Sequence, residues 1–483
     1  MLENIDEIVR ILKEETNNID DIIYREKYIG KTKIYIIYNE PITSSDKISD
    51  FIIRSLNRLE DVPRKKLYAS IKNNISNFKV KEISNYEDLC LNLHSGFTII
   101  IMEGENKGFA LETKASINRA VGEPSEENVV RGAKDAFVED FQINIGLIKK
   151  RIRSNDLWMD KITIGKYTKT NVGVLYINKV AKKELIDEAK KRLNQIDIAG
   201  IVNSSTIKNL ITNENTKLPT VITTERPDLV SKALLEGKIA IVVENSPFVL
   251  IIPAMLTDLF KSIEDEYGKS INVTSTRFIR AIAFFIALLT PAIYIALITY
   301  NQEMIPIDLL VSFATQRDGV PFPAFVEATM MLLSFEILRE SDLRAPTFTG
   351  SSLSIVGALI LGEAAVNAGI VSPIMIIIVA ITSISSLPFS EIELTNTLRT
   401  YRILFMLGAI FMGIIGVVII FLFFIIRASS IESFGKPYLM PYVPTNFTGL
   451  KKSIIRFPIK KLLKRESYLS NNEVSQRSHN NEE

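Results

Sequence analysis

The sequence predicts an α+β protein, in which an N-terminal cytoplasmic domain of two related α/β subdomains precedes an α-helical polytopic membrane domain. Charged residues are dense up to about Arg280, scarce from there to Arg427, and mostly basic afterwards. The mean hydropathy of +0.18, with 23% charged residues, is therefore an average over two unlike halves. Apolar stretches long enough to cross a bilayer as helices, about 20 residues, lie in the second half. A repeated order of strands and helices marks the first half.

The soluble half begins with an expected amphipathic helix that extends to about residue 28, because the apolar residues between Ile5 and Leu12 share one face. A strand at 33–38 and a helix at 46–59 should follow. We assign residues 1–120 to the first subdomain. Residues 121–260 form a helical connector and the second subdomain.

A glycine-closed helix followed by a strand pair occurs twice in this half, which predicts the two related subdomains. The first copy has its helix at Tyr86–His94, and the second at Pro227–Leu235. The expected strands are 97–102 and 107–111 in the first copy, and 172–177, 239–243 and 248–252 in the second, which also has a helix at 182–193.

The connector between the copies is expected to be a helix that Ser125 caps and that continues to the basic run Lys149–Arg151, whose charges suit a helix C-terminus. Two interpretations remain open at this point. The helix is either a solvated link or a binding surface for a ligand or partner.

The residue types exclude several classes of protein. There is no N-terminal signal peptide pattern, so the soluble half is expected in the cytoplasm. Cys90 is the single cysteine, and His94 and His479 are the two histidines. These numbers exclude an internal disulfide and a His-pair zinc motif. Neither a phosphate-binding loop nor an aromatic-interleaved basic surface for nucleic acid is present. We expect no enzyme activity, no cofactor and no bound metal.

The second half predicts a membrane domain at residues 270–430 and a basic cytoplasmic tail at 431–483 whose end is disordered. Expected spans are 281–299, 352–368, 370–388 and 403–426, the last being the cleanest, and a kink is expected at Pro291 in the first. Segments 306–314 and 322–338 are too short or too charged to be assigned as spans. Basic flanks place both termini inside, which requires an even number of crossings, either four or six.

Charged residues at membrane depth are candidate functional groups. Glu327 and Glu336 lie nine residues apart on one predicted helix, which places them on opposite faces. Arg339 is three residues from Glu336 and can pair with it. Glu363 is the one charge within the expected 352–368 helix.

That helix also combines small side chains with a carboxylate, as a pore lining or gate would require. The pore-lining candidates are Ser354, Ala358, Leu361, Gly362 and Ala365. Ala409, Gly413 and Gly416 form a second small-residue face in the last span. Small faces favour close helix packing, either between copies of the chain or inside one subunit.

Several long motifs, in the same order, resemble the A subunit of the GerA family of spore germinant receptors. The resemblance covers roughly residues 122–444, and residues 1–120 match weakly. Glu363 stands where Gln is expected, and Ala133-Lys134 where Pro-Arg is usual. The motifs are Val130–Gly132, Phe137–Asp140, Thr224–Asp228, Pro247–Pro253, Gly319–Ala328, Phe335–Glu340, Ser354–Leu359, Ala364–Pro373 and Ser433–Leu439.

The resemblance implies a multi-pass protein of the spore inner membrane that works with a permease-like B subunit and a lipoprotein C subunit. It also implies a homo-oligomeric ring that forms a nutrient-gated channel for monovalent cations. Three other functions stay open: a proton-coupled secondary transporter with Glu327 or Glu363 as its coupling site, an intramembrane enzyme, and a non-conducting scaffold for the permease. The absence of an inverted repeat argues against the transporter.

Overall fold

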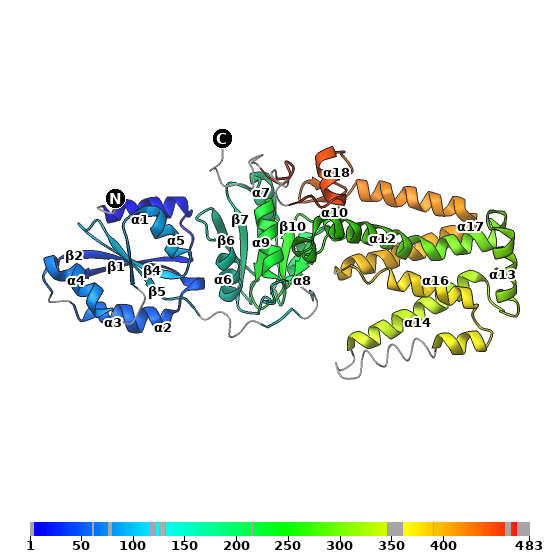
Figure 1. Cartoon of the computed structure of the whole chain (residues 1–483), viewed down its shortest axis with the longest axis horizontal. Helices are drawn as coiled ribbons and strands as arrows, with labels where there is room; N and C mark the ends of the chain where they lie inside the picture. The colour runs from blue at the N-terminus through cyan, green and yellow to red at the C-terminus, as the bar shows by residue number, and fades with distance from the viewer. Residues whose placement is uncertain are drawn as a thin grey trace.

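The computed structural model describes residues 4–59, 62–75, 80–115, 122–124, 127, 129, 132–213, 216–344, 361–389, 391–458 and 465–470. Two mixed α and β units lie side by side in the N-terminal part, and a helical region follows them (Figure 1). The second unit lies between the first unit and the helices, so it is the one placed to contact both.

The first unit is a five-stranded antiparallel sheet with the strand order β1-β2-β4-β5-β3. Helices α1 and α5 cover one face, and the π-helical stretch Ile48–Ile53 with α3 and α4 covers the other. A π-helical stretch, Ile48–Ile53, joins α2 to α3. The bounds are α1 (Ile5–Glu15), β1 (Ile22–Ile29), β2 (Thr32–Asn39), α2 (Ser45–Lys47), α3 (Arg54–Asn57), α4 (Arg64–Asn74), β3 (Val80–Ile83), α5 (Tyr86–Leu93), β4 (Phe97–Met102) and β5 (Gly108–Glu112).

The second unit repeats this architecture with the order β6-β7-β9-β10-β8, so the recurrence extends from local pattern to strand order. Helices α6 and α9 cover one face of the sheet. Helices α7 and α8 cover the other. The bounds are α6 (Phe141–Arg151), β6 (Leu157–Ile164), β7 (Thr170–Ile177), α7 (Lys183–Asn194), α8 (Ser204–Ile211), β8 (Ile222–Thr224), α9 (Pro227–Glu236), β9 (Ile239–Val243) and β10 (Val249–Ile252).

The first helix is shorter than the sequence predicted. It ends at Glu15, and the expectation of a helix to about residue 28 is wrong because Ile22–Ile29 is strand β1. Asn17 and Asn18 have positive φ angles of 54° and 51°, which turn the chain out of the helix. Eight register pairs then join β1 to β2.

The connector helix is also shorter than expected. Asp140 caps its first turn by accepting a hydrogen bond from the Ile143 N–H at 2.9 Å, and residues 132–139 are not helical. A continuous helix from Ser125 is therefore wrong, although Ser125 itself lies outside the described residues. The Phe137 N–H donates to the Glu225 carbonyl at 2.8 Å, so the second unit holds this segment in an extended form.

Helix α6 is not a solvated link, because its apolar side chains fill one core of the second unit. Its Lys149 extends to the first unit, where its Nζ lies 2.6 Å from Asp21 Oδ2. Both side chains are about 95% buried, at 5% and 4% exposure. A buried pair of this kind disfavours separation of the units, since each charge would lose its partner.

The helical region follows the second unit. Two helices among the described residues, α12 and α17, are long and apolar enough by length and composition to cross a membrane. The bounds are α10 (Leu256–Leu259), α11 (Glu264–Tyr267), α12 (Ser270–Thr299), α13 (Ile307–Arg317), α14 (Ala324–Arg344), α16 (Pro373–Ile384), α17 (Ile392–Ser429) and α18 (Phe447–Ile454), with a further helical stretch at 361–367.

Helix α17 is a hairpin and not one rod. Its chain breaks at Gly413, which has φ 62° and ψ −140°. Tyr401 packs on Phe424 and Phe405 on Phe421, with ring centroids 4.8 and 6.4 Å apart, so the two arms run antiparallel. The prediction of one straight span at 403–426 is therefore wrong. Glycine alone supports the turn, because a side chain there would be strained.

The predicted small-residue face of Ala409, Gly413 and Gly416 is divided between the two arms of α17, because the chain turns at Gly413. Ala409 is fully buried. Gly416 lies against Gly408 of the other arm, and a Cβ on Gly416 would come within 2.0 Å of the Gly408 carbonyl oxygen. Close packing through these glycines occurs within one chain.

The segment after α17 packs onto the second unit and is not simply a solvated tail. A short hairpin of β11 (Glu432–Ser433) and β12 (Lys436–Pro437) places Phe434 in the core beside α7 and α8. Ser433 Oγ donates to the Thr220 carbonyl at 2.8 Å. Farther along, Ser470 forms a bridge with Ala181. The sequence predicted disorder from Glu466 to residue 483, which is wrong for Glu466–Ser470, because Leu469 is buried and Ser470 forms this bridge. Residues 471–483 lie outside the described residues.

Candidate functional site

The most enclosed charged group of the helical region is the Glu327 carboxylate on the first turn of α14, which is 0% exposed. Glu327 Oε2 accepts hydrogen bonds from the Ser372 N–H at 2.9 Å and from Ser372 Oγ at 2.8 Å. Glu327 Oε1 lies 3.2 Å from the Arg317 guanidinium at the end of α13. Ser372 is the residue before α16, so the carboxylate also lies at the positive end of that helix. One side chain thus joins three helices.

Three buried polar atoms around this carboxylate have no hydrogen-bond partner among the described residues: Glu327 Oε1, Arg317 Nε and the Tyr294 hydroxyl. Tyr294 belongs to α12 and is 5% exposed. Buried polar atoms are normally satisfied, so this cluster retains capacity for further hydrogen bonds. We call these four residues, Tyr294, Arg317, Glu327 and Ser372, the Glu327 network.

Glu336 belongs to a different environment, as the opposite-face prediction requires. Its Oε1 lies 3.1 Å from Arg399 Nε on the first arm of α17, and its Oε2 lies 3.6 Å from Arg339 Nε. The predicted pairing of Glu336 with Arg339 is present. Among the described residues, Glu327 and Glu336 have different ion-pair partners.

Arg402, one turn after Arg399, compensates for a proline. Pro291 has no N–H, and so the Ala287 carbonyl four residues earlier loses its helical donor. Arg402 Nε donates to this Ala287 oxygen at 2.8 Å. The interaction joins α12 to α17 in a buried, apolar place, where an unsatisfied carbonyl is costly.

We predict that Arg402→Met destabilises the helical region by about 1–3 kcal/mol, because it leaves the Ala287 carbonyl unsatisfied. Adding Pro291→Ala restores a backbone donor and should recover part of that loss. Unfolding midpoints of the detergent-purified single and double variants measure both effects. Equal midpoints for Arg402→Met with and without Pro291→Ala would show that the carbonyl is not the cause.

The pore-lining candidates are only partly placed. Ser354 and Ala358 lie outside the described residues. Leu361 is exposed at 39%, while Gly362 is buried and Ala365 packs against the helical core. Glu363 is exposed. Whether these residues line a pore stays a prediction.

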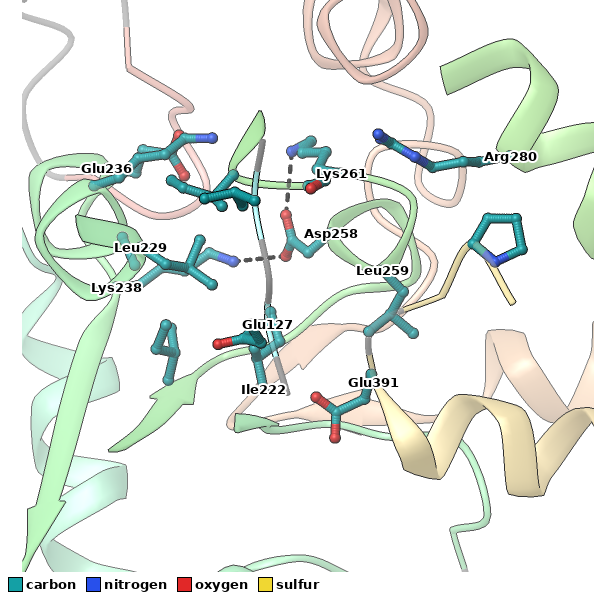
Figure 2. A pocket seen from close by; sticks show the side chains of 17 residues that line it. Glu127, Ile222, Leu229, Glu236, Lys238, Asp258, Leu259, Lys261, Arg280 and Glu391 are labelled. Atoms are coloured by element: carbon teal, nitrogen blue, oxygen red, sulfur yellow. Dashed lines mark hydrogen bonds and ion pairs between the residues drawn. The ribbon is translucent and has the colours of Figure 1, made fainter. Parts of the chain in front are cut away.

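A second site lies at the junction between the soluble units and the helical region, where a cavity of about 100 Å³ is lined by residues from both (Figure 2). Lys238, just before β9, lines it from the second unit, and Asp258 of α10 and Lys261 line it from the segment that leads into the helices. Arg280 of α12 and Glu391, just before α17, line it from the helical side. A movement of the helices relative to the second unit would therefore change this cavity.

Asp258 is the charged centre of this junction pocket. Its Oδ2 lies 2.6 Å from Lys238 Nζ and its Oδ1 lies 3.1 Å from Lys261 Nζ, the two contacts drawn as dashed lines in Figure 2. Burial alone would raise the pKa of Asp258, but the two ammonium groups outweigh burial and hold its pKa well below the ordinary value. This carboxylate therefore stays ionised.

The motif Thr224–Asp228 holds the connector against this pocket. Arg226 is 1% exposed, and its guanidinium donates to the Glu127 carbonyl at 3.1 Å and the Ala133 carbonyl at 2.9 Å. The Glu225 carboxylate accepts from the Glu127 N–H at 3.0 Å, and the Glu127 carboxylate accepts from the Glu225 N–H at 3.1 Å. This reciprocal arrangement gives the motif a structural role.

Glu127 itself titrates in an unusual range. Burial raises the pKa of its carboxyl group from 4.5 to about 7, although hydrogen bonds from Thr224 and the Glu225 backbone oppose the rise. A raised carboxyl pKa means that the folded protein binds the proton more tightly than the unfolded chain. Stability from this group is complete below pH 4.5 and is lost as the pH rises towards 7.

We predict that Glu127→Gln, which mimics the protonated form, flattens the dependence of unfolding free energy on pH between about 4.5 and 7. Chemical denaturation of wild type and variant at several pH values across that window tests this. Glu123→Gln is the matched control, because Glu123 is an exposed carboxylate of the same segment. Parallel pH curves for wild type and Glu127→Gln would contradict the assignment.

Glu391 connects the soluble part directly to the hairpin helix. Its Oε1 lies 2.9 Å from Lys208 Nζ of α8, and its Oε2 accepts from the Thr223 N–H at 3.2 Å. Glu393, one residue into α17, also lies 2.9 Å from Lys208 Nζ. Lys208 is 5% exposed. The first arm of α17 is thereby held to the second unit by buried charge.

Comparison with known proteins identifies the family. The family described as Bacillus/Clostridium GerA spore germination protein matches residues 10–468. The chain belongs to the GerA family. It is 38% identical to spore germination protein KA of Bacillus subtilis over 451 residues, which cover 92% of this chain and 83% of that protein. It is 35% identical to the uncharacterized membrane protein YfkQ of the same organism, covering 94% of this chain and 89% of YfkQ.

A crystal structure of the N-terminal domain of the A subunit of the Bacillus megaterium spore germinant receptor GerK3 also matches. It is 31% identical in sequence, with a TM-score of 0.43, and covers 53% of this chain and 96% of that domain. No group of three or more potential metal ligands occurs among the described residues of this GerA-family chain.

The GerA motifs meet one another in space. Gly319–Ala328 contains Glu327, and Ala364–Pro373 contains its partner Ser372. Thr224–Asp228 binds the segment that contains Phe137–Asp140. Reading the sequence missed Tyr294, Arg317 and Ser372 as partners of Glu327. The one available signal was Ser372-Pro373, a typical helix start at the end of the motif Ala364–Pro373.

Proposed function

We propose that this chain is the A subunit of a nutrient germinant receptor in the spore inner membrane, and that it oligomerises as a ring to form a nutrient-gated channel for monovalent cations. A permease-like B subunit and a lipoprotein C subunit are its proposed partners. GerA membership supports the role in germination. The apolar helices, and a relative named as a membrane protein, support the membrane location.

The observation that carries the gating part of the proposal is the Glu327 network. It links α13 and α14 to Ser372, seven residues after the pore candidate Ala365. A buried ion pair favours one arrangement strongly, because a partly opened arrangement leaves charges without partners. Such a network can separate a closed from an open arrangement, and a ligand shifts the balance only by binding one of them more tightly.

The junction contacts supply a path from the soluble units to the same helices. Lys208 holds Glu391 and Glu393 at the start of α17, and the α17 arms pack against α12, which carries Tyr294 of the Glu327 network. Both termini are proposed to lie in the cytoplasm, which requires an even number of crossings, either four or six. No role as an enzyme is proposed.

Cation release from nutrient-treated spores that carry Ala358→Phe tests the channel. If Ala358 lines the pore, the bulky ring should block release, while Ala358→Ser should leave it close to wild type. Co-purification of the partner subunits shows that the receptor is still assembled. Unchanged release from an assembled Ala358→Phe receptor would remove this helix from the pore. Purified wild type that conducts no ions in bilayers, alone or with its partners, would favour the scaffold function.

A further inference from the structure

The helical region has an excess of arginine around Glu336. Arg339 and Arg399 flank this single carboxylate, and the charge of Arg402 also acts on it. Arg339 and Arg399 thus share this one carboxylate, while Arg402 donates to the Ala287 carbonyl. A buried or half-buried charge in an apolar helical region normally has a counter-charge of its own, so two guanidinium groups on one carboxylate leave room for a further anion.

The donors of the cluster are also incompletely used. Arg399 Nη2 is buried and has no hydrogen-bond partner among the described residues, and Arg339 Nε and Arg399 Nε have only their ion-pair contacts with Glu336. The side chains are nevertheless open at one side, since Arg399 is 27% exposed and Arg339 is 37% exposed. A ligand can therefore approach the two guanidinium groups from the surface of the helical region.

The position of the cluster favours the cytoplasmic leaflet. Arg399 is 14 residues from the Gly413 turn and Arg339 is 15 residues from the start of α14, which place them about 21 and 22 Å along their helices. The hydrocarbon core is about 30 Å thick, and a long arginine side chain can extend to the headgroup layer. The start of α17 is held to the second unit through Glu391 and Glu393, and Arg399 lies about two turns farther along this arm.

We propose that Arg339 and Arg399, with Arg402 behind them, form a binding site for a phosphate group, supplied by the headgroup of an anionic phospholipid in the cytoplasmic leaflet. This inference requires the membrane placement proposed above, but it does not require a channel. Guanidinium groups bind phosphate through paired, charge-assisted hydrogen bonds. Glu336 holds the two arginines in place and competes with the phosphate for them.

Native mass spectrometry of the full-length protein can measure lipid retention after exposure to phosphatidylglycerol or phosphatidylcholine with matched acyl chains. Wild type should retain phosphatidylglycerol preferentially. Arg339→Gln/Arg399→Gln should reduce that retention about tenfold or more. The matched control is Arg10→Gln/Arg54→Gln, which removes two arginines that are 70% and 73% exposed in the soluble part. It should not change retention.

Glu336→Gln keeps the three arginines and removes their competing carboxylate, so it should increase retention of phosphatidylglycerol. A cluster that serves only to pair charges predicts no gain in this variant. The unfolding midpoint in inorganic phosphate, compared with that in chloride at equal ionic strength, distinguishes a lipid headgroup from free phosphate as the source of the bound phosphate group. Stabilisation by phosphate without lipid preference assigns the site to the free anion. Equal retention of both lipids with no phosphate effect, or full retention by Arg339→Gln/Arg399→Gln, would overturn the proposal.

Discussion

A Glu327→Leu variant is expected to lose about 3–5 kcal/mol of the unfolding free energy of the helical region. The substitution removes the only ion-pair partner found for Arg317 among the described residues, and it removes the acceptor for the Ser372 N–H and hydroxyl. The Glu327 side chain is fully buried, so water cannot replace it without rearrangement of the helices. The unfolding midpoint of the detergent-purified protein should fall, and spores with this variant should respond poorly to nutrients.

Two further variants separate charge loss from packing loss. Glu363→Leu is the matched control, because it removes an exposed carboxylate of the same region and should change stability by only about 0.5 kcal/mol. Arg317→Met/Glu327→Leu removes both charges and should be more stable than Glu327→Leu alone, since no unpaired charge remains. A Glu327→Leu protein as stable as Glu363→Leu would show that the network does not hold the three helices together.

Much of the soluble fold could be predicted because its signals are local. A strand such as β9 is a short apolar run after a glycine, and the chain at Gly237 reverses with φ 96°. Strand β1 was missed because its residues also fit a helix pattern. Its pairing with β2 is what makes this segment a strand, and that pairing is not visible in the local sequence. The same holds for β6, an edge strand of its sheet in which buried and partly exposed residues alternate at the start.

The helical region was predicted less well because its decisive features are contacts between distant residues. Length and hydropathy cannot distinguish one long helix from two arms that fold back at Gly413. The partners of Glu327 lie 10 and 45 residues away, and neither spacing has a sequence signature. The charged residues themselves were found, since a carboxylate in an apolar helix is conspicuous. Their partners require the fold.

Gly413→Ala is expected to disrupt the hairpin of α17 and to cost about 3 kcal/mol or more. The backbone at this position, with φ 62° and ψ −140°, is accessible in practice only to glycine. A Cβ would also come within 2.6 Å of Asn301 Oδ1 and 2.8 Å of Tyr300 Cβ, at the end of α12. Asn301 Oδ1 accepts from the Ile414 N–H at 3.1 Å, so the clash also weakens the contact that closes the turn.

A crosslink between the arms tests the geometry directly. In a Cys90→Ser background, which has no other cysteine, Tyr401→Cys and Phe424→Cys place one thiol on each arm. A short bifunctional reagent should join them when residue 413 is glycine and fail to do so in Gly413→Ala. Gly362→Ala is the matched control, because a Cβ there meets Ile376 at an ordinary 3.7 Å. Equal crosslinking and equal unfolding midpoints in Gly413→Ala and Gly362→Ala would mean that the two arms of α17 do not depend on this turn.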